Sequence, residues 1–445
     1  MPTKDEIKTM ALDAIDLRKD WLIQIAETIL SNPEAGFQEV KTARLVHEKL
    51  DELGIPHQTG IALTGIKGVL TGGSPGPTVA VIGELDSLRV LDHPHADPET
   101  GAAHACGHHA QIGMMLGAAI GLMTPDVLAA LSGNIVLIAV PAEEFIDVEY
   151  RWGLRQEGKL GLMAGKQEFI RLGAFDDVDM AMMAHTTSRP EDKKLALGGT
   201  SNGHVVKLVK FIGRAAHAGG APYAGINALH AATIAITAIN ANRETLKDQD
   251  VVRIHGILTR GGVAVNSIPA DVRYEGRVRG NTLEAIEDAN QKVDRSFRAG
   301  ALAMGAKVNI ITLPGYLPLL NNSHMMDIFK ENAARLVGQH HITQYPTDRN
   351  AGGSTDMGDL SQIMPVVHPY AGGATGVGHG NDYLIGDYET AVINPAKAMA
   401  MSVIDLLYGG AAKAKEVMAK HRPALTKAKY LKLQAERLRE ELFEG

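Results

Sequence analysis

Apolar positions along the chain follow two spacings, one typical of helices and one typical of strands. Residues 4–31 carry apolar side chains at helical spacing, and the pattern returns over 42–53 before Gly54 and Pro56 end it, so two opening helices are predicted. Strand-like and helical runs then alternate. The strand-like runs are 65–70, 78–83, 134–140 and 178–184, and the helical runs follow His109 and cover 165–172. Such alternation is typical of βαβ units, so we predict an α/β fold with a mainly parallel sheet covered by helices.

The pattern changes between residues 198 and 315. Strand-like runs and two long helical runs occur there in the order βαββαβ, which predicts an inserted ferredoxin-like α+β domain. The strand-like runs are 205–211, 251–258, 271–278 and 307–313, and the helical runs are 226–246 and 283–303. We therefore expect a discontinuous main domain, 1–197 and 316–445, interrupted by the insertion 198–315. The tail from Lys413 has helical spacing and mixed charge, and is expected to form a solvated face or a packing arm.

Composition narrows the function classes. The formal net charge is −7, and no Lys/Arg-rich stretch is interleaved with aromatic residues, so we expect no nucleic-acid partner. The N-terminal residues have no apolar signal region, and the longest apolar run, 113–123, is too short to cross a bilayer. A single cysteine allows no intrachain disulfide. These features favour a cytoplasmic protein that does not bind membranes.

The cysteine lies in the most informative segment of the chain. Cys106 is followed by Gly107 and His108, and the adjacent carboxylates Glu143 and Glu144 come directly after an apolar strand-like run. A lone cysteine is often a buried hydrophobe, and a Glu-Glu pair is often solvated. Together, however, thiolate, imidazole and carboxylate are ligands that Zn²⁺ or Mn²⁺ selects, and a spare carboxylate can accept a proton from a metal-activated water. The pattern predicts a metal-dependent hydrolase.

Several further motifs occur in a characteristic order. They are Glu84-Leu-Asp-Ser-Leu88, Cys106-Gly-His108, Glu143-Glu144, His185 and Gly376-Val-Gly-His-Gly380, with Asn32-Pro-Glu-Ala-Gly-Phe37 before them and Ser354-Thr-Asp-Met-Gly358 near the end. On these motifs the chain resembles the dimetal amidohydrolase family that includes aminoacylases, carboxypeptidases acting on N-acyl amino acids, and bacterial aminobenzoyl-glutamate hydrolases. The likeness covers most of the chain and implies a metallopeptidase-like catalytic domain with an inserted lid and dimerisation domain.

The resemblance also implies roles for individual residues. It implies two divalent ions, Zn²⁺ or Mn²⁺, at the C-terminal edge of the sheet, and Glu143 as the general base. Asp86 would orient a ligand, or is an ordinary aspartate at a strand end. The implied metal ligands are Cys106, His108, Glu144, His185 and His379.

The inserted domain contributes a second set of candidates by the same resemblance. His217 would donate a hydrogen bond to the oxyanion of the tetrahedral intermediate, reaching it from the partner subunit of a homodimer. Asn266 would bind a substrate carbonyl or carboxylate. Arg279 would pair with a substrate carboxylate, or is a surface arginine of a strand.

One position departs from many relatives, which have an acidic residue directly after Cys-Gly-His where this chain has His109. This leaves the local charge and the metal preference open. His93, His95 and His104 also crowd the segment, and we interpret them as loop residues because no ligand count requires them.

The predicted function is hydrolysis of the amide C–N bond in a small N-acyl or aminoacyl amino-acid conjugate. Two alternatives stay open. One is a hydrolytic deaminase acting on an aromatic or cyclic amine, and the other is a non-catalytic, metal-dependent binding protein. Retention of Glu143 favours an enzyme, because a pure binding site does not require a general base.

Overall fold

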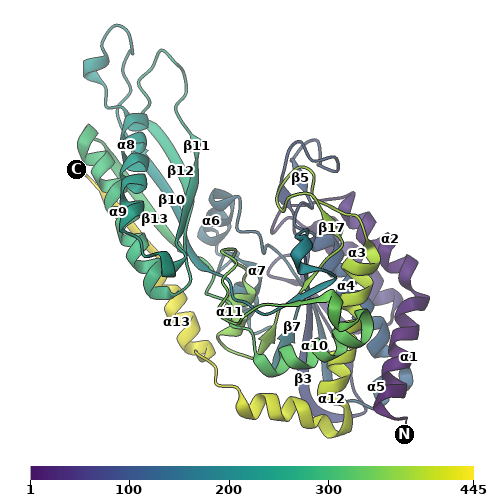
Figure 1. Cartoon of the computed structure of the whole chain (residues 1–445). Coiled ribbons are helices and arrows are strands. Elements are labelled where there is room, and N and C mark those ends of the chain that lie inside the picture. The colour runs from purple at the N-terminus through teal and green to yellow at the C-terminus, as the bar shows by residue number, and fades with distance from the viewer. Residues whose placement is uncertain (1) are drawn as a thin grey trace.

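The larger of two lobes, which holds most of the expected catalytic domain and is called the catalytic lobe below, is built on a six-stranded sheet with helices on both faces (Figure 1). The computed structural model describes residues 2–445. Strands β6, β3, β7 and β15 pair in parallel, and β2 and β1 extend one edge in antiparallel orientation. In order across the sheet, the strands are β1 (His57–Ile61), β2 (Gly65–Thr71), β6 (Ser132–Val140), β3 (Ser74–Glu84), β7 (Met180–Met182) and β15 (Val366–Val367). The predicted α/β fold with a mainly parallel sheet is confirmed.

The central strand β3 separates two cores. Val79 and Val81 pack against one set of helices, and Ala80 and Ile82 pack against another, because successive side chains of a strand point to opposite faces. Both faces are buried, which explains why the strand is a continuous apolar run. The first set is α1 (Lys4–Leu17), α2 (Lys19–Leu30), α3 (Val40–Glu52), α4 (His108–Met123), α10 (Ser323–Val337) and α12 (Asn394–Lys420), and the second is α6 (Val148–Gln156), α7 (Gly165–Leu172), α11 (Met357–Ser361) and α13 (Lys427–Arg437).

The N-terminal segment forms three helices rather than the two predicted. α1 and α2 are separated only by Arg18, whose backbone is not helical (φ −110°, ψ 11°). The break lets Ile7 in α1 and Leu22 in α2 reach the same core, while Leu17 is 86% exposed. Apolar spacing does not locate such a break, because both helices keep the same period.

The second lobe, the lid, is an antiparallel sheet with two helices on one face (Figure 1). The strand order is β11-β12-β10-β13-β19, and the helices α8 and α9 cover the face turned away from the catalytic lobe. The elements are β10 (Gly203–Ile212), α8 (Ala228–Ala241), β11 (Arg253–Arg260), β12 (Asp271–Gly280), α9 (Leu283–Met304), β13 (Lys307–Pro314) and β19 (Arg439–Phe443). The predicted ferredoxin-like insertion is confirmed as an α+β unit.

The last strand corrects the expected role of the chain's C-terminal part. We expected 316–445 to return to the catalytic domain, but β19 pairs with β13 and forms an edge of the lid sheet. Phe443 packs against the lid core. The pairing satisfies backbone groups of β13 that an uncovered edge would leave open, so the tail is a structural part of the lid.

Helix α12 is the long core helix of the catalytic lobe. Its helical geometry is interrupted at Tyr408–Ala411, where Gly409 and Gly410 adopt left-handed backbone angles. One segment of the described chain, Glu389–Lys420, is long and apolar enough to cross a membrane by length and composition, but 89% of its apolar window is buried inside the fold. Such burial is typical of a core helix in a globular domain.

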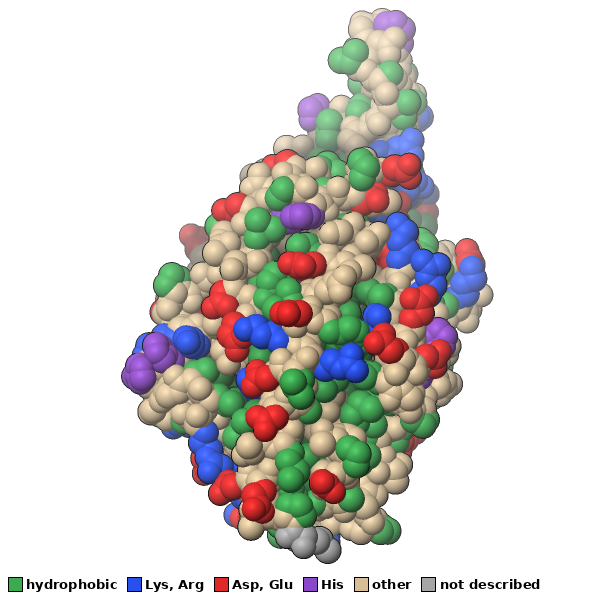
Figure 2. Space-filling model, turned by 90° about the vertical axis from the view of Figure 1, so that its right-hand side faces the viewer, with side chains coloured by type: hydrophobic (Ala, Val, Ile, Leu, Met, Phe, Trp, Pro, Cys, Tyr) green, Lys and Arg blue, Asp and Glu red, His purple; other side chains and the backbone are tan. Residues whose placement is uncertain are grey.

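Short elements complete the catalytic lobe. A four-stranded sheet, β14-β9-β16-β8, and two two-stranded sheets flank the main sheet. On the face shown in Figure 2, acidic and basic side chains are interspersed, and the lid extends beyond the catalytic lobe at the top. The remaining elements are β4 (Leu88–Arg89), β5 (Ala102–Ala103), α5 (Pro125–Ala129), β8 (His185–Thr186), η1 (Pro190–Asp192), β9 (Leu195–Leu197), η2 (Pro222–Ala224), η3 (Asn242–Thr245), η4 (Asp248–Asp250), η5 (Gln339–His341), β14 (Ile342–Gln344), β16 (Tyr370–Ala371), β17 (Ala374–Thr375), β18 (Leu384–Ile385) and η6 (Glu389–Ile393).

Candidate metal centre and active site

The ends of the parallel strands bring the candidate ligands to one edge of the sheet. Glu84 ends β3, Glu143 and Glu144 follow β6, and His185 follows β7. Cys106 and His108 lie at the start of α4, and His379 lies in the loop between β17 and β18. This edge is where open parallel sheets place their ligand sites, because the loops that follow the strands meet there.

Two groups of candidate ligands share one residue, Cys106. One group contains His108 and His185, the other contains Glu144 and His379, and the ligand atoms of each group lie within 4.8 Å of one another. Sγ of Cys106 lies 3.4 Å from Nε2 of His185, and Nε2 of His379 lies 3.3 Å from Oε1 of Glu144. Two ligand groups joined by a shared thiol fit a pair of divalent ions.

The buried histidine His108 supports that fit. Its Nε2 atom is inaccessible to solvent and makes no hydrogen bond, although it lies 3.1 Å from the carboxylate of Glu84. When the ring is neutral with its proton on Nδ1, Nε2 has a free lone pair that a metal ion would satisfy.

The backbone geometry at position 107 explains why a glycine separates Cys106 and His108. Its φ is +89°, and a Cβ atom there would lie 2.1 Å from Oγ1 of Thr186. Only glycine combines left-handed backbone geometry with such a close contact. The residue lets the chain turn sharply between Cys106 and His108, so that both side chains face the same site.

The thiol of Cys106 is suited to a cation rather than to nucleophilic attack. Burial, together with the neighbouring Glu144 carboxylate, raises the pKa of the Cys106 thiol. Catalytic cysteine nucleophiles have lowered pKa values, whereas a metal ion deprotonates a coordinating thiol outright.

Glu143 is buried beside the candidate ligands. Its Oε2 lies 3.9 Å from Nε2 of His108, and its backbone carbonyl accepts a hydrogen bond from the hydroxyl of Tyr316. Burial and the negative charges of Glu84 and Glu144 hold the pKa of Glu143 well above its usual range. Divalent cations beside these carboxylates would counter that effect, since they stabilise the ionised form.

Asp86 is completely buried and contacts two of the candidate ligand residues. Its carboxylate lies 3.1 Å from Nδ1 of His108 and accepts a hydrogen bond of 2.8 Å from the backbone N–H of Glu144. The structure thus places Asp86 where it can fix the orientation of both residues.

Sequence reasoning missed a buried ionic group beneath the site. Nζ of Lys166 lies 2.5 Å from a carboxylate oxygen of Glu84 and 2.5 Å from one of Asp356, and all three side chains are buried. Glu84 and Asp356 occur in the motifs that carried the resemblance, but Lys166 lies in an unremarkable helical run. No local signal could have identified it.

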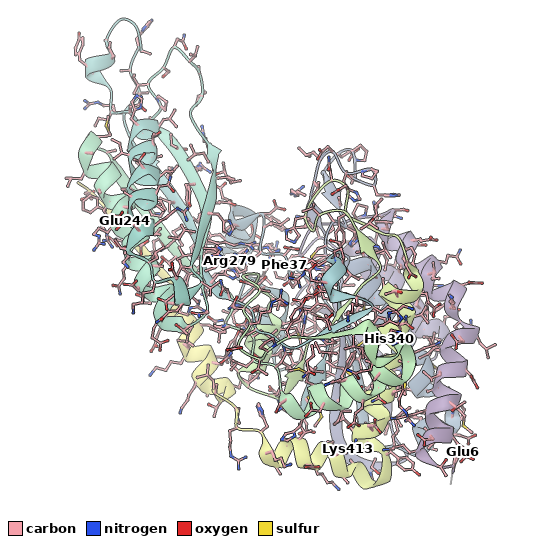
Figure 3. All side chains as sticks on the ribbon, in the orientation of Figure 1. Glu6, Phe37, Glu244, Arg279, His340 and Lys413 are labelled. Carbon is pink, nitrogen blue, oxygen red and sulfur yellow. The ribbon has the colours of Figure 1, made fainter. Side chains whose placement is uncertain are left out.

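A cavity of about 420 Å³ lies between the ligand cluster and the lid. Arg279 lines it and donates a hydrogen bond of 2.9 Å to Oγ of Ser354. Figure 3 shows Arg279 on the side of the lid sheet that is turned toward the catalytic lobe. Arg253, His255 and Arg277 line the same cavity, and sequence reasoning singled out none of them.

His217 and Asn266 lie apart from this cavity. They are neighbours in the loops beyond β10 and β11, where the N–H of Ala218 donates to the carbonyl of Asn266 at 3.0 Å, and both are exposed. Nδ1 of His217 accepts hydrogen bonds from the N–H groups of Gly219 and Gly220. Its proton therefore resides on Nε2, which points a donor outward.

The other histidines near Cys106 do not join the ligand groups. His109 and His104 pack with their ring centroids 5.3 Å apart, and burial, reinforced by the charge of His108, lowers the pKa of His109 to about 3. Nε2 of His93 hydrogen-bonds to the carbonyl of Tyr383 at 2.9 Å. His109 thus takes a neutral, packed position beside the candidate ligands.

Comparison with known proteins agrees with the fold and with the motifs. The family described as "Peptidase family M20/M25/M40" matches residues 80–392. Xaa-Arg dipeptidase of Mus musculus is 30% identical over 338 residues, covering 74% of this chain and 70% of that protein. IAA-amino acid hydrolase ILR1-like 4 of Arabidopsis thaliana is 27% identical over 370 residues, covering 79% of this chain and 77% of that protein.

A solved structure shares the fold. The YXEP protein of Bacillus subtilis, described as a dinuclear metal binding peptidase from the M20 family, superposes with a TM-score of 0.60 at 21% sequence identity. The match covers 87% of this chain and 98% of the YXEP chain.

Proposed function

Because the chain belongs to the peptidase family M20/M25/M40, whose hydrolases act on amide or peptide bonds, we propose that it cleaves the amide C–N bond of small N-acyl or aminoacyl amino-acid conjugates. The observation that carries this proposal is the pair of ligand groups sharing Cys106, with the buried carboxylate of Glu143 beside them. The names of the mouse dipeptidase and the Arabidopsis hydrolase point to the same class of substrate.

Cys106, His108, Glu144, His185 and His379 would hold two divalent ions, with Zn²⁺ or Mn²⁺ as the proposed metals. Bound ions would act as Lewis acids and make water at the site more acidic. The dinuclear site named for the Bacillus protein supports two ions here. Asp86 would orient His108 through Nδ1, which leaves Nε2 free to bind.

Glu143 would take a proton from the attacking water and pass it to the leaving nitrogen. The water oxygen forms a bond to the amide carbon, the C–N bond breaks, and the products are a carboxylic acid and an amine. Arg279 would bind a carboxylate of the substrate from the lid side of the cavity.

His217 and Asn266 would serve the site of a second copy. Both lie away from the cavity of their own chain, beside exposed apolar side chains, since Val263 is 85% exposed and Tyr223 is 87% exposed. A homodimer formed through the lid would bury this surface and bring the Nε2–H donor of His217 to the partner's substrate. The homodimer, and a cytoplasmic location, stay predictions.

Metal content and hydrolysis, measured together, test the proposal. The wild type should bind close to two ions per chain and hydrolyse members of a panel of N-acyl amino acids and dipeptides. Cys106→Ala should bind less metal. Glu143→Gln should keep the metal and lose activity by about 10²–10⁴-fold, the usual contribution of a general base.

Undiminished turnover in Glu143→Gln, or a wild-type protein that binds neither Zn²⁺ nor Mn²⁺, would contradict the proposal. Tight ligand binding without turnover over the whole panel would favour a binding protein. Release of ammonia from aromatic amines, with no cleavage of amides, would favour a deaminase.

A further inference from the structure

We propose that Arg253 and Arg277, on the lid wall of the cavity, bind a second negative charge on the substrate, so that the preferred substrates are conjugates of dicarboxylic amino acids. The inference rests on the amide hydrolysis proposed above and names the substrate class of that site. Arg279 was assigned there to one carboxylate, and the two additional arginines have no role in that assignment.

Three arginines and one histidine form a block on one face of the lid sheet; burial, reinforced by the charge of Arg279, lowers the pKa of the histidine, His255, to about 4 and leaves it neutral. Arg253 on β11 lies directly opposite Arg279 on β12, and His255 lies opposite Arg277 in the same antiparallel ladder. Residues two apart in a strand share a face, so all four project to the same side. All four line the cavity beside the candidate metal ligands.

The three arginines of this block form no ion pair in the part of the chain that the structure describes, although the charge of Glu144 acts on Arg277 and Arg279 from beyond contact distance. Among residues 2–445, the hydrogen bonds of Arg253, Arg277 and Arg279 go to uncharged groups. Arg277 donates to the carbonyl of Phe145 at 2.6 Å, and Arg253 donates to the carbonyl of Val252 at 3.0 Å. Arg279 donates to Oγ of Ser354 at 2.9 Å and to Nε2 of His255 at 3.1 Å.

The arrangement is costly without an anion. Like charges directly opposite each other in an antiparallel pair destabilise the sheet. Arg279 is also half-buried, and burial, reinforced by the charge of Arg277, lowers its pKa to about 10. A bound anion would relieve both costs.

A third arginine on the same face of β12 shows the contrast. Arg273 lies farther along the strand and pairs with Asp271 at 3.1 Å and with Glu149 at 3.0 Å. Arg273, which lies outside the cavity beside the ligand cluster, is therefore neutralised by the protein, whereas Arg277 and Arg279, which line that cavity, form no ion pair. That difference indicates that the missing anion belongs to the ligand.

One carboxylate does not account for the block. A guanidinium group typically binds one carboxylate through two parallel hydrogen bonds, so Arg279 satisfies a single carboxylate. Arg253 and Arg277 then remain, and a second carboxylate on the substrate side chain would pair with them. A cationic side chain at that position would instead add to the existing repulsion.

The test compares substrates of equal shape that differ in charge. N-acetyl-L-glutamate and N-acetyl-L-glutamine, and the dipeptides alanyl-glutamate and alanyl-glutamine, are assayed with the metal-loaded wild type, together with N-acetyl-L-arginine. We expect kcat/KM to be at least about 10-fold higher for each glutamate compound than for its glutamine counterpart, because charge-assisted hydrogen bonds are strong. The arginine compound should be the poorest substrate.

Substitutions of the arginines test which side chains cause the preference for glutamate compounds. Arg277→Gln and Arg253→Gln should each lower the ratio of glutamate to glutamine kcat/KM several-fold, and Arg277→Lys should restore part of it. The matched control is Arg273→Gln, on the same strand and face, which should leave the ratio unchanged. Equal kcat/KM for the glutamate and glutamine compounds in the wild type would overturn the inference, whatever the variants do.

Binding of the products separates this inference from the proposed function. The affinities of the metal-loaded wild type for L-glutamate and L-glutamine are measured by calorimetry, which requires no turnover. Tighter binding of glutamate by at least about 10-fold supports the inference even if no compound is hydrolysed, a result that would contradict only amide hydrolysis. Equal affinities, with amide hydrolysis intact, would overturn the inference alone.

Discussion

Asp86 and His108 form a buried pair, with Oδ1 of Asp86 3.1 Å from Nδ1 of His108. The other oxygen of the same carboxylate accepts the backbone N–H of Glu144 at 2.8 Å. One side chain in the segment just after β3 therefore connects helix α4 to the segment that follows β6. Because it contacts both segments, Asp86 can set the relative position of two proposed metal ligands.

Asp86→Asn should weaken metal binding. Asparagine presents an N–H₂ group where one of the two contacts requires an oxygen, so either Glu144 loses its acceptor or His108 keeps only the backbone carbonyl of residue 86, 2.9 Å from its Nδ1. Loss of such a supporting contact typically lowers metal affinity by about 10–100-fold. Competition with a chromophoric chelator measures the change, and Asp177→Asn, at an exposed ion pair with Lys67, is the control. Unchanged affinity in Asp86→Asn would show that the contact does not orient the ligand.

Lys166→Met should strongly destabilise the catalytic lobe. The substitution removes a buried cation and leaves the carboxylates of Glu84 and Asp356 unpaired, which costs about 3–5 kcal/mol. Urea unfolding followed by circular dichroism measures the loss. Lys159→Met is the matched control, because Lys159 forms an exposed pair with Glu157, and such pairs contribute about 0–1 kcal/mol. A similar loss in both variants would contradict the buried network.

Asp359 should make stability depend on pH. Burial raises the pKa of Asp359 to about 7, above its value in an unfolded chain. Because the pKa of Asp359 is higher in the folded state, the folded state stays protonated up to a higher pH than the unfolded chain. The contribution of Asp359 to the free energy of unfolding is therefore fully present below about pH 4 and is lost as the pH rises to about 7.

Asp359→Asn tests this contribution. The amide keeps an oxygen acceptor for Tyr430 and Gln434, which lie 2.9 Å and 2.8 Å from Oδ1. The stability of the variant relative to the wild type should therefore increase between about pH 4 and 7 and stay constant above that range. Urea unfolding at several pH values measures the difference, and a difference that does not vary with pH would contradict the assignment.

Mixing two inactive variants should restore activity if His217 serves the partner's site. In a mixed dimer of Glu143→Gln and His217→Ala, one site combines an intact Glu143 with an intact His217 from the partner. Random pairing of equal amounts should restore about a quarter of the wild-type activity, because half of the dimers are mixed and each has one complete site. Two Glu143→Gln chains provide the control, and no recovery after confirmed subunit exchange would place His217 outside the partner's site.

Local sequence determined much of the fold. The strands β3 and β6 were predictable from continuous apolar runs, because both of their faces are buried. Helix α7 and the lid strands were predictable from regular spacing, because an element that buries one face carries apolar residues at the period of that element. Strand β1 and helix α6 were missed. The break at Arg18 was also missed, because it leaves the helical period unchanged. The contribution of β19 to the lid sheet was not predictable either, because it depends on the uncovered edge of β13, more than a hundred residues earlier in the chain.

The sequence alone determined which functional groups are present: a single thiol between histidines, a pair of adjacent carboxylates, and motifs in the order of a metal-dependent hydrolase family. Only the tertiary structure decided how these groups combine. It joined Cys106 to His185 and Glu144 to His379, supported Glu84 with Lys166, and placed Arg253 and Arg277 beside Arg279. Metal binding and charge recognition depend on distances of a few ångström between residues far apart in the chain, and those distances exist only once the strands have been aligned and the lid has packed over them.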